Sequence, residues 1–149
     1  MKGKIRVFCR VRPISNQEKA QGSLPVITVV DQYTVRLRTK QAALTGSQDP
    51  PVYKDEDFSF DSCFADSTSQ SEIFEDTRNL MQSALDGFNV CVFAYGQTGS
   101  GKTYTIQGTG EAPGIVPNAL QEIFDLKEKQ GQKMAQVSFE CYMLELYLD

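Results

Sequence analysis

A glycine-rich segment between an apolar run and a helix-forming stretch constrains this chain more than any other feature. The segment is Gly96-Gln97-Thr98-Gly99-Ser100-Gly101-Lys102-Thr103, and it matches the phosphate-binding pattern G-x-x-x-x-G-K-[ST]. The run before it, Val90–Tyr95, is apolar without alternation, which is typical of a central strand covered on both faces. A strand, a glycine loop and a helix in this order predict an α/β unit with a P-loop.

The residue types of this loop suit one kind of chemistry. Glycines let backbone N–H groups converge on phosphate oxygens in dihedral regions closed to other residues. We expect Lys102 to reach the β- and γ-phosphates, Thr103 to place its hydroxyl on Mg²⁺, and the following helix to offer its positive N-terminal end. The alternative is a glycine-rich turn that only caps a helix, but such a turn does not require the Lys-Thr pair.

The bulk composition excludes several classes of function. Fifteen basic and 19 acidic residues give a net charge of −4, which argues against nucleic acid or an anionic membrane as a primary partner. The sequence has no histidine, so Ser-His-Asp triads and histidine-based zinc sites are excluded. No stretch approaches the roughly 18 apolar residues of a membrane span, and the start has no apolar signal region. We therefore expect a soluble, untargeted single domain.

The four cysteines predict free thiols rather than a disulfide framework or a metal site. They lie far apart without a C-x-x-C pair, at Cys9, Cys63, Cys91 and Cys141. Cys9 and Cys91 stand inside apolar, strand-like runs, where a thiol behaves as a small hydrophobe. We expect buried free thiols in a reducing cytosol.

The first half of the chain predicts strands followed by one long helix. Alternation from Ile5 to Arg12 predicts a strand with a cationic face, which ends at Pro13. Short β-prone pieces from Val26 to Asp57 predict a small β meander with a loop around Ala42–Pro51. A capping box at Ser69–Glu72, followed by apolar residues at helical spacing up to Gly87, predicts an amphipathic helix.

The second half predicts a helix with a break and a final strand. A helix should begin after Lys102, stop at the glycines and proline of 108–114, and resume from Pro117 toward Gly131. The stretch Met134–Leu148 is rich in β-branched, aromatic and apolar residues and predicts a strand. Such a strand would leave an unpaired sheet edge.

Several segments resemble the kinesin motor domain and fall in the order of that family. Phe93–Thr105 is similar to the kinesin P-loop signature, and Ile5–Pro13 resembles the first kinesin strand with its R-x-R-P ending. The other similar segments are Phe58-Ser59-Phe60-Asp61 with Phe64, Gly114-Ile115-Val116-Pro117, and Glu145-Leu146-Tyr147-Leu148-Asp149. Gly3–Cys9 resembles the opening of the C-terminal-motor, minus-end-directed kinesins, and Met1–Lys4 resembles that of their calmodulin-binding plant and protist members.

This resemblance implies a fold and a domain organisation. The fold would be an α/β P-loop NTPase of the kinesin and myosin type, with a central mostly parallel sheet, flanking helices and a small β lobe, and it would be incomplete. Residues 1–149 would form the N-terminal part of a motor domain, because neither the N-x-x-S-S-R-S-H switch nor the D-x-x-G-x-E switch occurs. Phosphoryl transfer depends on positioning a water and stabilising charge at the γ-phosphate. We therefore expect this segment alone to hydrolyse ATP very poorly.

The resemblance also implies the residues of a nucleotide site for ATP or ADP with Mg²⁺. All eight residues of Gly96–Thr103 would bind the nucleotide, with Lys102 and Thr103 as the catalytic pair and Thr103 as the Mg²⁺ ligand. The base side would consist of Arg10, Arg12, Pro13 and Tyr104. Arg10 and Pro13 would pack on the adenine, and Tyr104 would stack against it. The alternative for the two arginines is a solvated strand face.

The implied function is that of a microtubule motor in which ATP hydrolysis drives movement. Its partner would be tubulin, and its place would be the cytoplasm and the microtubule cytoskeleton, with no nucleic acid or membrane partner. The parent protein would be a homodimer through a coiled coil, with a calmodulin-type regulator acting outside this segment.

Two alternative functions stay open. A small-molecule or nucleotide kinase is disfavoured, because such P-loops commonly follow the first strand, whereas 95 residues precede this one. The other alternative is a nucleotide-binding or structural segment without turnover.

Overall fold

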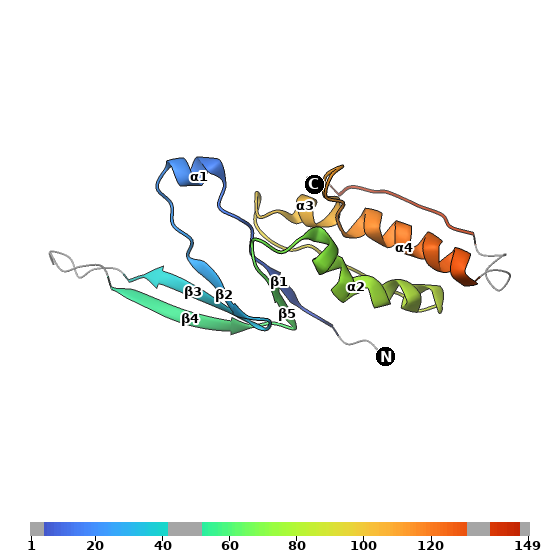
Figure 1. Ribbon diagram of the computed structural model, residues 1–149, viewed down its shortest axis with the longest axis horizontal. Coiled ribbons are helices and arrows are strands. Elements are labelled where there is room, and N and C mark those ends of the chain that lie inside the picture. The colour runs from blue at the N-terminus through green and yellow to red at the C-terminus, as the bar shows by residue number, and fades with distance from the viewer. Residues whose placement is uncertain (1–4, 42–51, 131–137, 147–149) are drawn as a thin grey trace.

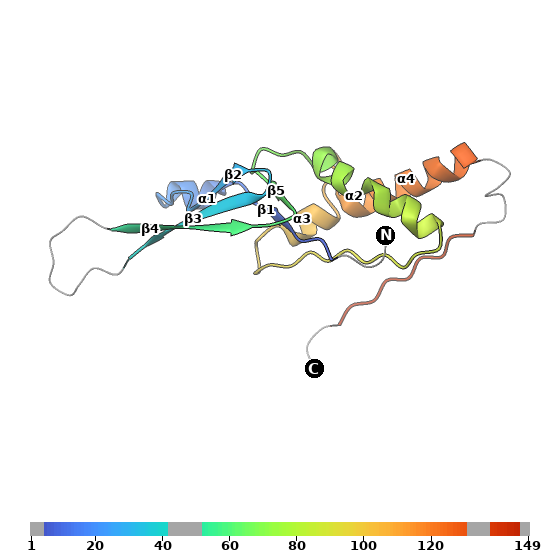
Figure 2. The same ribbon diagram turned by 90° about the horizontal axis from the view of Figure 1, so that it is seen from below.

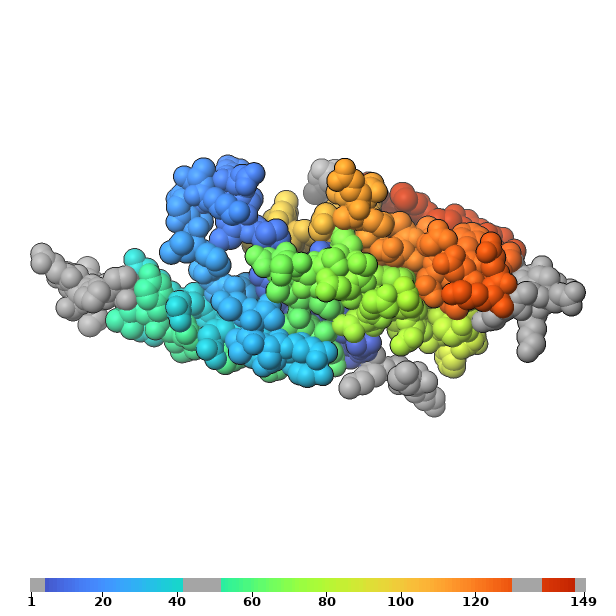
Figure 3. Space-filling view, viewed as in Figure 1, coloured from blue at the N-terminus to red at the C-terminus, as the bar shows by residue number. Residues whose placement is uncertain are grey.

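Two helices lie at one end of the molecule and a three-stranded sheet at the other, with the glycine loop between them (Figure 1). The computed structural model describes residues 5–41, 52–130 and 138–146. Its elements are β1 (Phe8–Arg10), α1 (Asn16–Ala20), β2 (Ile27–Asp31), β3 (Thr34–Lys40), β4 (Tyr53–Ser59), β5 (Ser62–Phe64), α2 (Gln70–Leu85), α3 (Lys102–Ile106) and α4 (Ile115–Gln130). The space-filling view shows that the molecule is elongated along this direction (Figure 3).

Strands β2, β3 and β4 form the predicted small β meander. They pair antiparallel in this order, and the Asp31 carboxylate accepts a hydrogen bond from the Tyr33 backbone N–H in the turn after β2. Arg36 and Arg38 on β3 form bidentate ion pairs across the sheet with Asp57 and Asp55 on β4. These pairs are exposed, so they fix the register more than they stabilise the fold. The predicted loop at Ala42–Pro51 lies outside the described residues.

The predicted first strand is shorter than the alternation of Ile5–Arg12 indicated. Strand β1 pairs in parallel with β5, from Phe8 opposite Ser62 to Arg10 opposite Phe64. Backbone hydrogen bonds from Asp61 to Val7 and from Val11 to Phe64 extend the pairing at both ends. Ile5 is 85% exposed and lies outside it, because β5 offers only three residues to pair with. The parallel pair with helices beside it agrees with the expected α/β class.

Helix α2 supplies half of the buried apolar side chains among the described residues and confirms the predicted amphipathic helix. Its N-cap, Ser69, forms the expected capping box with Glu72, and the hydrogen bonds from Ser69 lower the pKa of the Glu72 carboxyl. Ile73, Phe74 and Met81 are buried on one face of α2, and this helix packs against α4. Burying a side chain of this size stabilises a fold by about 1.5–3 kcal/mol. The helix ends at Leu85, shortly before Gly87 with its positive φ.

The predicted break between two helices is a tight loop closed by backbone contacts. Helix α3 ends at Ile106, and α4 begins at Ile115, two residues before the expected Pro117. Gly108 and Pro113 form an isolated antiparallel bridge between them. Gly108 has a φ of +74°, and a Cβ placed there would lie 2.2 Å from the Ala112 carbonyl oxygen. Only glycine therefore fits at this position.

The predicted central strand at Val90–Tyr95 is wrong for this chain. The segment is extended but pairs with no strand among the described residues, and Figure 2 shows its trace outside the helices. Phe93 is 88% exposed and Tyr95 fully exposed, so the face that carries these two side chains is not covered. A buried strand needs neighbours on both sides, and the strands of the described chain pair among themselves in two separate sheets.

The predicted strand at Met134–Leu148 is also absent where the structure describes it. Residues 138–146 are extended without strand pairing (Figure 2). Phe139 packs edge-on against Phe124 of α4, with 5.1 Å between the ring centroids. Tyr142, Met143 and Leu146 are at least 84% exposed. The ends of the predicted strand lie outside the described residues.

The expectation of buried thiols holds for Cys63 and in part for Cys9, and it is wrong for Cys91 and Cys141. All four are free; Cys63 is buried and Cys9 is half-buried, and this burial raises the pKa of both thiols. Cys91 and Cys141 are exposed, because each belongs to one of the two extended segments without a partner strand.

None of the helices in the described ranges combines the length and apolarity needed to cross a bilayer.

We expect Gly108→Ala to destabilise the chain, because the new Cβ meets backbone atoms and the positive φ is strained for alanine. The matched control is Gly110→Ala, where nothing lies within 4 Å of the added Cβ and φ is not in the left-handed range. Urea unfolding should show a loss of about 1–3 kcal/mol for the first variant and little change for the second. Equal unfolding midpoints for the two variants would contradict the tight loop.

We also expect this chain to self-associate through its two exposed apolar segments, Val90–Tyr95 and residues 138–146, because large contiguous apolar surfaces are rare on monomers. Light scattering after size exclusion should show oligomers. A variant with Met143→Lys and Leu146→Lys should shift the distribution toward monomer, since both side chains are 93% exposed and support no core. A monodisperse, stable wild-type monomer would show that these segments do not associate.

Candidate functional site

The glycine loop connects the extended segment Val90–Tyr95 to α3, and its glycines are required by its shape. Gly99 and Gly101 have φ values of +78° and +97°, in the left-handed region that glycine adopts without strain. A Cβ on Gly96 would lie 2.5 Å from the Ser100 hydroxyl oxygen. A side chain at this first position would therefore force the Ser100 side chain to move.

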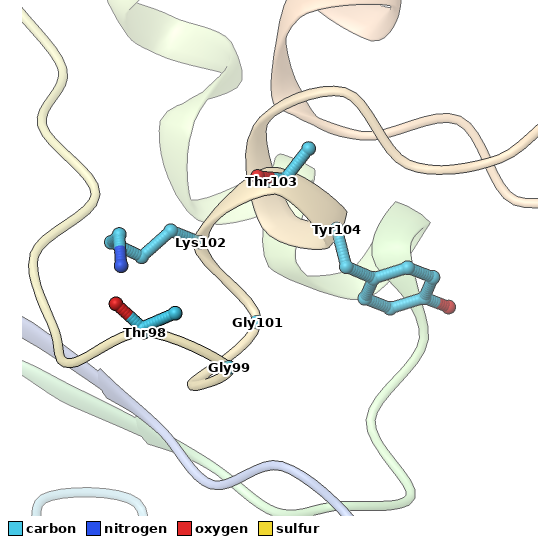
Figure 4. Close-up of a pocket in the computed structure, with 6 residues that line it drawn as sticks. All are labelled: Thr98, Gly99, Gly101, Lys102, Thr103 and Tyr104. Atoms are coloured by element: carbon cyan, nitrogen blue, oxygen red, sulfur yellow. The ribbon is translucent and has the colours of Figure 1, made fainter. Parts of the chain in front are cut away.

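Lys102, the first residue of α3, folds back over this loop. Its Nζ donates hydrogen bonds to the carbonyl oxygens of Gly96 and Gln97 at 2.9 and 3.0 Å. In Figure 4, Lys102 and Thr98 lie on the same side of the loop, while the Tyr104 ring points away from them. The cation is thus held at the centre of the loop by neutral carbonyl groups.

A hollow of about 330 Å³ opens at this loop, which is at the small end of the range for ligand sites. Its lining residues are Thr98, Gly99, Gly101, Lys102, Thr103 and Tyr104 (Figure 4). The hollow brings together one ammonium group, the exposed Thr103 side chain and the backbone of two glycines. Such a set of donors suits an anion with several oxygens.

The helix after the loop is short, as the predicted stop at residues 108–114 requires. Helix α3 has five residues, and its N-cap, Gly101, makes no side-chain cap hydrogen bond. A helix of this length has only a small dipole. The loop backbone and Lys102 therefore carry the attraction for an anion.

Arg10 and Tyr104, predicted together on the base side, lie in contact. The Arg10 guanidinium carbon is 5.1 Å from the centroid of the Tyr104 ring, within the range of a cation–π interaction. Burial lowers the pKa of Arg10, and arginine remains a cation at neutral pH despite such a change. Tyr104 is 44% exposed, so its ring still offers surface to a flat ligand.

Two residues that sequence reasoning missed hold Arg10 in this place. Its Nη1 donates to Oε1 of Gln70 at 2.7 Å and to Oγ1 of Thr105 at 2.9 Å. These partners are 60 and 95 residues away in the chain, so no local pattern marks them. The only local signal is the position of Gln70 inside the capping box, directly after its N-cap residue Ser69.

Arg12 and Pro13 lie on the side of α1. The Arg12 guanidinium forms two hydrogen bonds with the Glu18 carboxylate, at 2.6 and 2.8 Å. This pairing holds the pKa of Glu18 far below its usual range and raises that of Arg12. The structure thus gives Arg12 an ion pair with α1, and its role toward a nucleotide stays a prediction.

The kinesin motor domain family model matches residues 10–149. The chain belongs to the kinesin motor domain family. It is 43% identical over 149 residues to kinesin-like protein KIN-14E of Arabidopsis thaliana and 44% identical over 149 residues to kinesin-like protein KIN-14I of Oryza sativa subsp. japonica. It is also 44% identical over 147 residues to protein claret segregational of Drosophila melanogaster.

These alignments cover 100%, 100% and 99% of this chain, but only 11%, 11% and 20% of the three relatives. The chain thus spans at most a fifth of their length. The plant relatives are KIN-14 kinesins, and a further relative, 41% identical over 155 residues, is carboxy-terminal kinesin 2 of Xenopus laevis. The predicted resemblance to C-terminal kinesins is confirmed. Membership of this family also implies that the chain derives from a nucleotide-binding fold.

Proposed function

We propose that this chain is the nucleotide-binding part of a microtubule motor, and that residues Gly96–Thr103 hold the phosphates of ATP or ADP. The observation that carries the proposal is the contact of the Lys102 ammonium with two loop carbonyls, in a chain of the kinesin motor domain family. Phosphate oxygens are charged and carbonyl oxygens are not, so a bound phosphate makes the stronger partner for Lys102. On binding, the Lys102 ammonium would exchange its hydrogen bonds to loop carbonyls for stronger ones to phosphate oxygens.

The backbone at Gly99 and Gly101 and the exposed Thr103 side chain also fit this assignment. The left-handed Gly99 and Gly101 turn the backbone around the hollow, where N–H groups can meet phosphate oxygens. The Thr103 side chain is exposed at the hollow, where its hydroxyl can bind the Mg²⁺ that accompanies the phosphates. Lys102 and Thr103 are the residues that we assign to the reacting end of the nucleotide.

The base side of the proposed site is the surface around Tyr104. Its half-exposed ring and the adjoining Arg10 guanidinium offer two flat groups for an adenine to stack on. We include Pro13 and Arg12 in this side from the kinesin resemblance. The ion pair of Arg12 with Glu18 limits its reach.

For the longer protein, the proposal is an ATPase of the cytoplasmic microtubule cytoskeleton that converts hydrolysis into movement. The names of the relatives support it, since they are kinesins and kinesin-like proteins. Dimerisation through a coiled coil and a calmodulin-type regulator concern sequence that this chain does not contain, and both stay predictions.

The second candidate is that residues 1–149, as the N-terminal part of a motor domain, bind a nucleotide without hydrolysing it. Neither switch motif of the kinesins occurs in the sequence, and hydrolysis needs groups that position water at the γ-phosphate. The two candidates share the binding step and differ only in turnover. Release of phosphate from ATP by the purified chain separates them.

We expect Lys102→Ala to weaken binding of Mg²⁺-ADP by roughly tenfold to a hundredfold, because it removes a charged hydrogen-bond donor to the phosphates. Calorimetric titration measures this change. The matched control is Lys129→Ala in the last turn of α4. It also removes one lysine charge, but at a position away from the loop, and should leave the affinity for Mg²⁺-ADP unchanged. Equal affinity of both variants for ADP would remove the phosphate-binding role of Lys102.

We expect Thr103→Ala to abolish most of the Mg²⁺ dependence of ADP binding. If the hydroxyl is a metal ligand, adding EDTA should weaken binding by the wild type several-fold and binding by the variant much less. Thr103→Ser, which keeps the hydroxyl, is the control and should behave as the wild type does. A variant with alanine that responds to EDTA as strongly as the wild type would exclude Thr103 as the ligand.

A further inference from the structure

The buried amide of Gln70 joins three parts of the chain at the proposed base side. Gln70 is 6% exposed and is the first residue of α2. Its Oε1 accepts from Arg10 of β1, and its Nε2 donates to the Tyr104 carbonyl of α3 at 2.5 Å and to the Ala112 carbonyl at 3.4 Å. Both ends of the amide are therefore used, and neither can turn without leaving a buried polar group unpaired.

The Thr105 hydroxyl forms a second link, which leads from Arg10 to the phosphate loop. Oγ1 accepts from Nη1 of Arg10 at 2.9 Å and donates to the Gly101 carbonyl at 3.0 Å. Gly101 lines the hollow at the loop. One guanidinium nitrogen is thus held by two acceptors, and one of these is itself bonded to the loop.

We propose that Gln70 and Thr105 are positioning residues that hold Arg10 beside the Tyr104 ring and so prepare the surface on which the nucleotide base stacks. An arginine side chain loses rotamer entropy when it is ordered. Where two hydrogen bonds already order it, a ligand does not bear that cost on binding. This inference rests on the proposed function and assigns the base contribution to residues that do not touch the phosphates.

The arrangement predicts that base and phosphate affinities respond differently to the same substitution. Loss of the hydrogen bonds that hold Arg10 should lower the affinity for a ligand that has a base and leave the affinity for a ligand that has phosphates alone unchanged. A merely structural role of Gln70 or Thr105 would disturb α3 and the loop together, and would weaken both ligands equally.

The test compares Mg²⁺-ADP with Mg²⁺-pyrophosphate as probes in calorimetric titrations of the whole chain. Thr105→Val keeps the shape but removes the hydroxyl, and it should weaken ADP binding about fivefold to tenfold. Pyrophosphate binding should stay within about twofold, since the main hydrogen-bonding groups at the phosphates are unchanged. Thr105→Ser restores the hydroxyl and should restore ADP affinity.

A second variant keeps the test decisive if valine at position 105 disturbs the helix. Gln70→Met fills a similar volume without either hydrogen bond, and it should show the same selective loss of ADP affinity. In a chain that already carries Arg10→Ala, neither Thr105→Val nor Gln70→Met should weaken ADP binding further, because their effect passes through Arg10.

Four outcomes would overturn the inference. Equal losses of ADP and pyrophosphate affinity, or a failure of Thr105→Ser to restore binding, would show that these residues support the fold rather than the base surface. ADP binding that depends on Lys102 but does not respond to Thr105→Val or Gln70→Met would overturn this inference alone. A wild-type chain that binds neither ADP nor pyrophosphate would overturn the proposed function and this inference with it.

Discussion

The hydrogen bond between the Arg10 guanidinium and the Gln70 amide is the contact on which the arrangement of the candidate site depends. It joins the end of β1 to the start of α2, and the same amide reaches the backbone of α3. The start of α2 is itself fixed by the capping box at Ser69. Because α3 begins directly after the glycine loop, this contact relates the position of the loop to that of the parallel strand pair.

The loop is supported unequally from its two ends. On the α3 side, Gly101 is bonded through Thr105 to Arg10 and so to the packed part of the molecule. On the other side, the loop continues into Val90–Tyr95, which has no strand partner in the described residues and is largely exposed. Few buried contacts on one side make that side the easier to move. Lys102, which bonds to Gly96 and Gln97, is then the main tie across the loop.

Local patterns were enough to predict the elements whose signals lie within one stretch of chain. Helix α2 follows from Ser69, Glu72 and the apolar spacing up to Gly87, and the meander and the helix break follow from turn residues in the same way. The strand at Val90–Tyr95 was wrong because apolar composition shows what a segment can pair with but not whether a partner is present. Gln70 and Thr105 were missed for a related reason, since their role comes from Arg10, far away in the chain.

The hydrogen bonds around Arg10 and those of Lys102 differ in a way that affects how a ligand would gain binding energy from the two sides of the candidate site. At the proposed base surface, hydrogen bonds already hold Arg10 beside Tyr104, so a base that stacks there would not have to order this side chain. The phosphate loop keeps its lysine on neutral carbonyls, which a charged ligand can displace. Under the proposed function, a nucleotide would meet an ordered surface at its base and exchangeable hydrogen-bond acceptors at its phosphates. Ligands that differ only in their phosphates should therefore change the contacts of Lys102 in the loop and leave the hydrogen bonds of Arg10 unchanged.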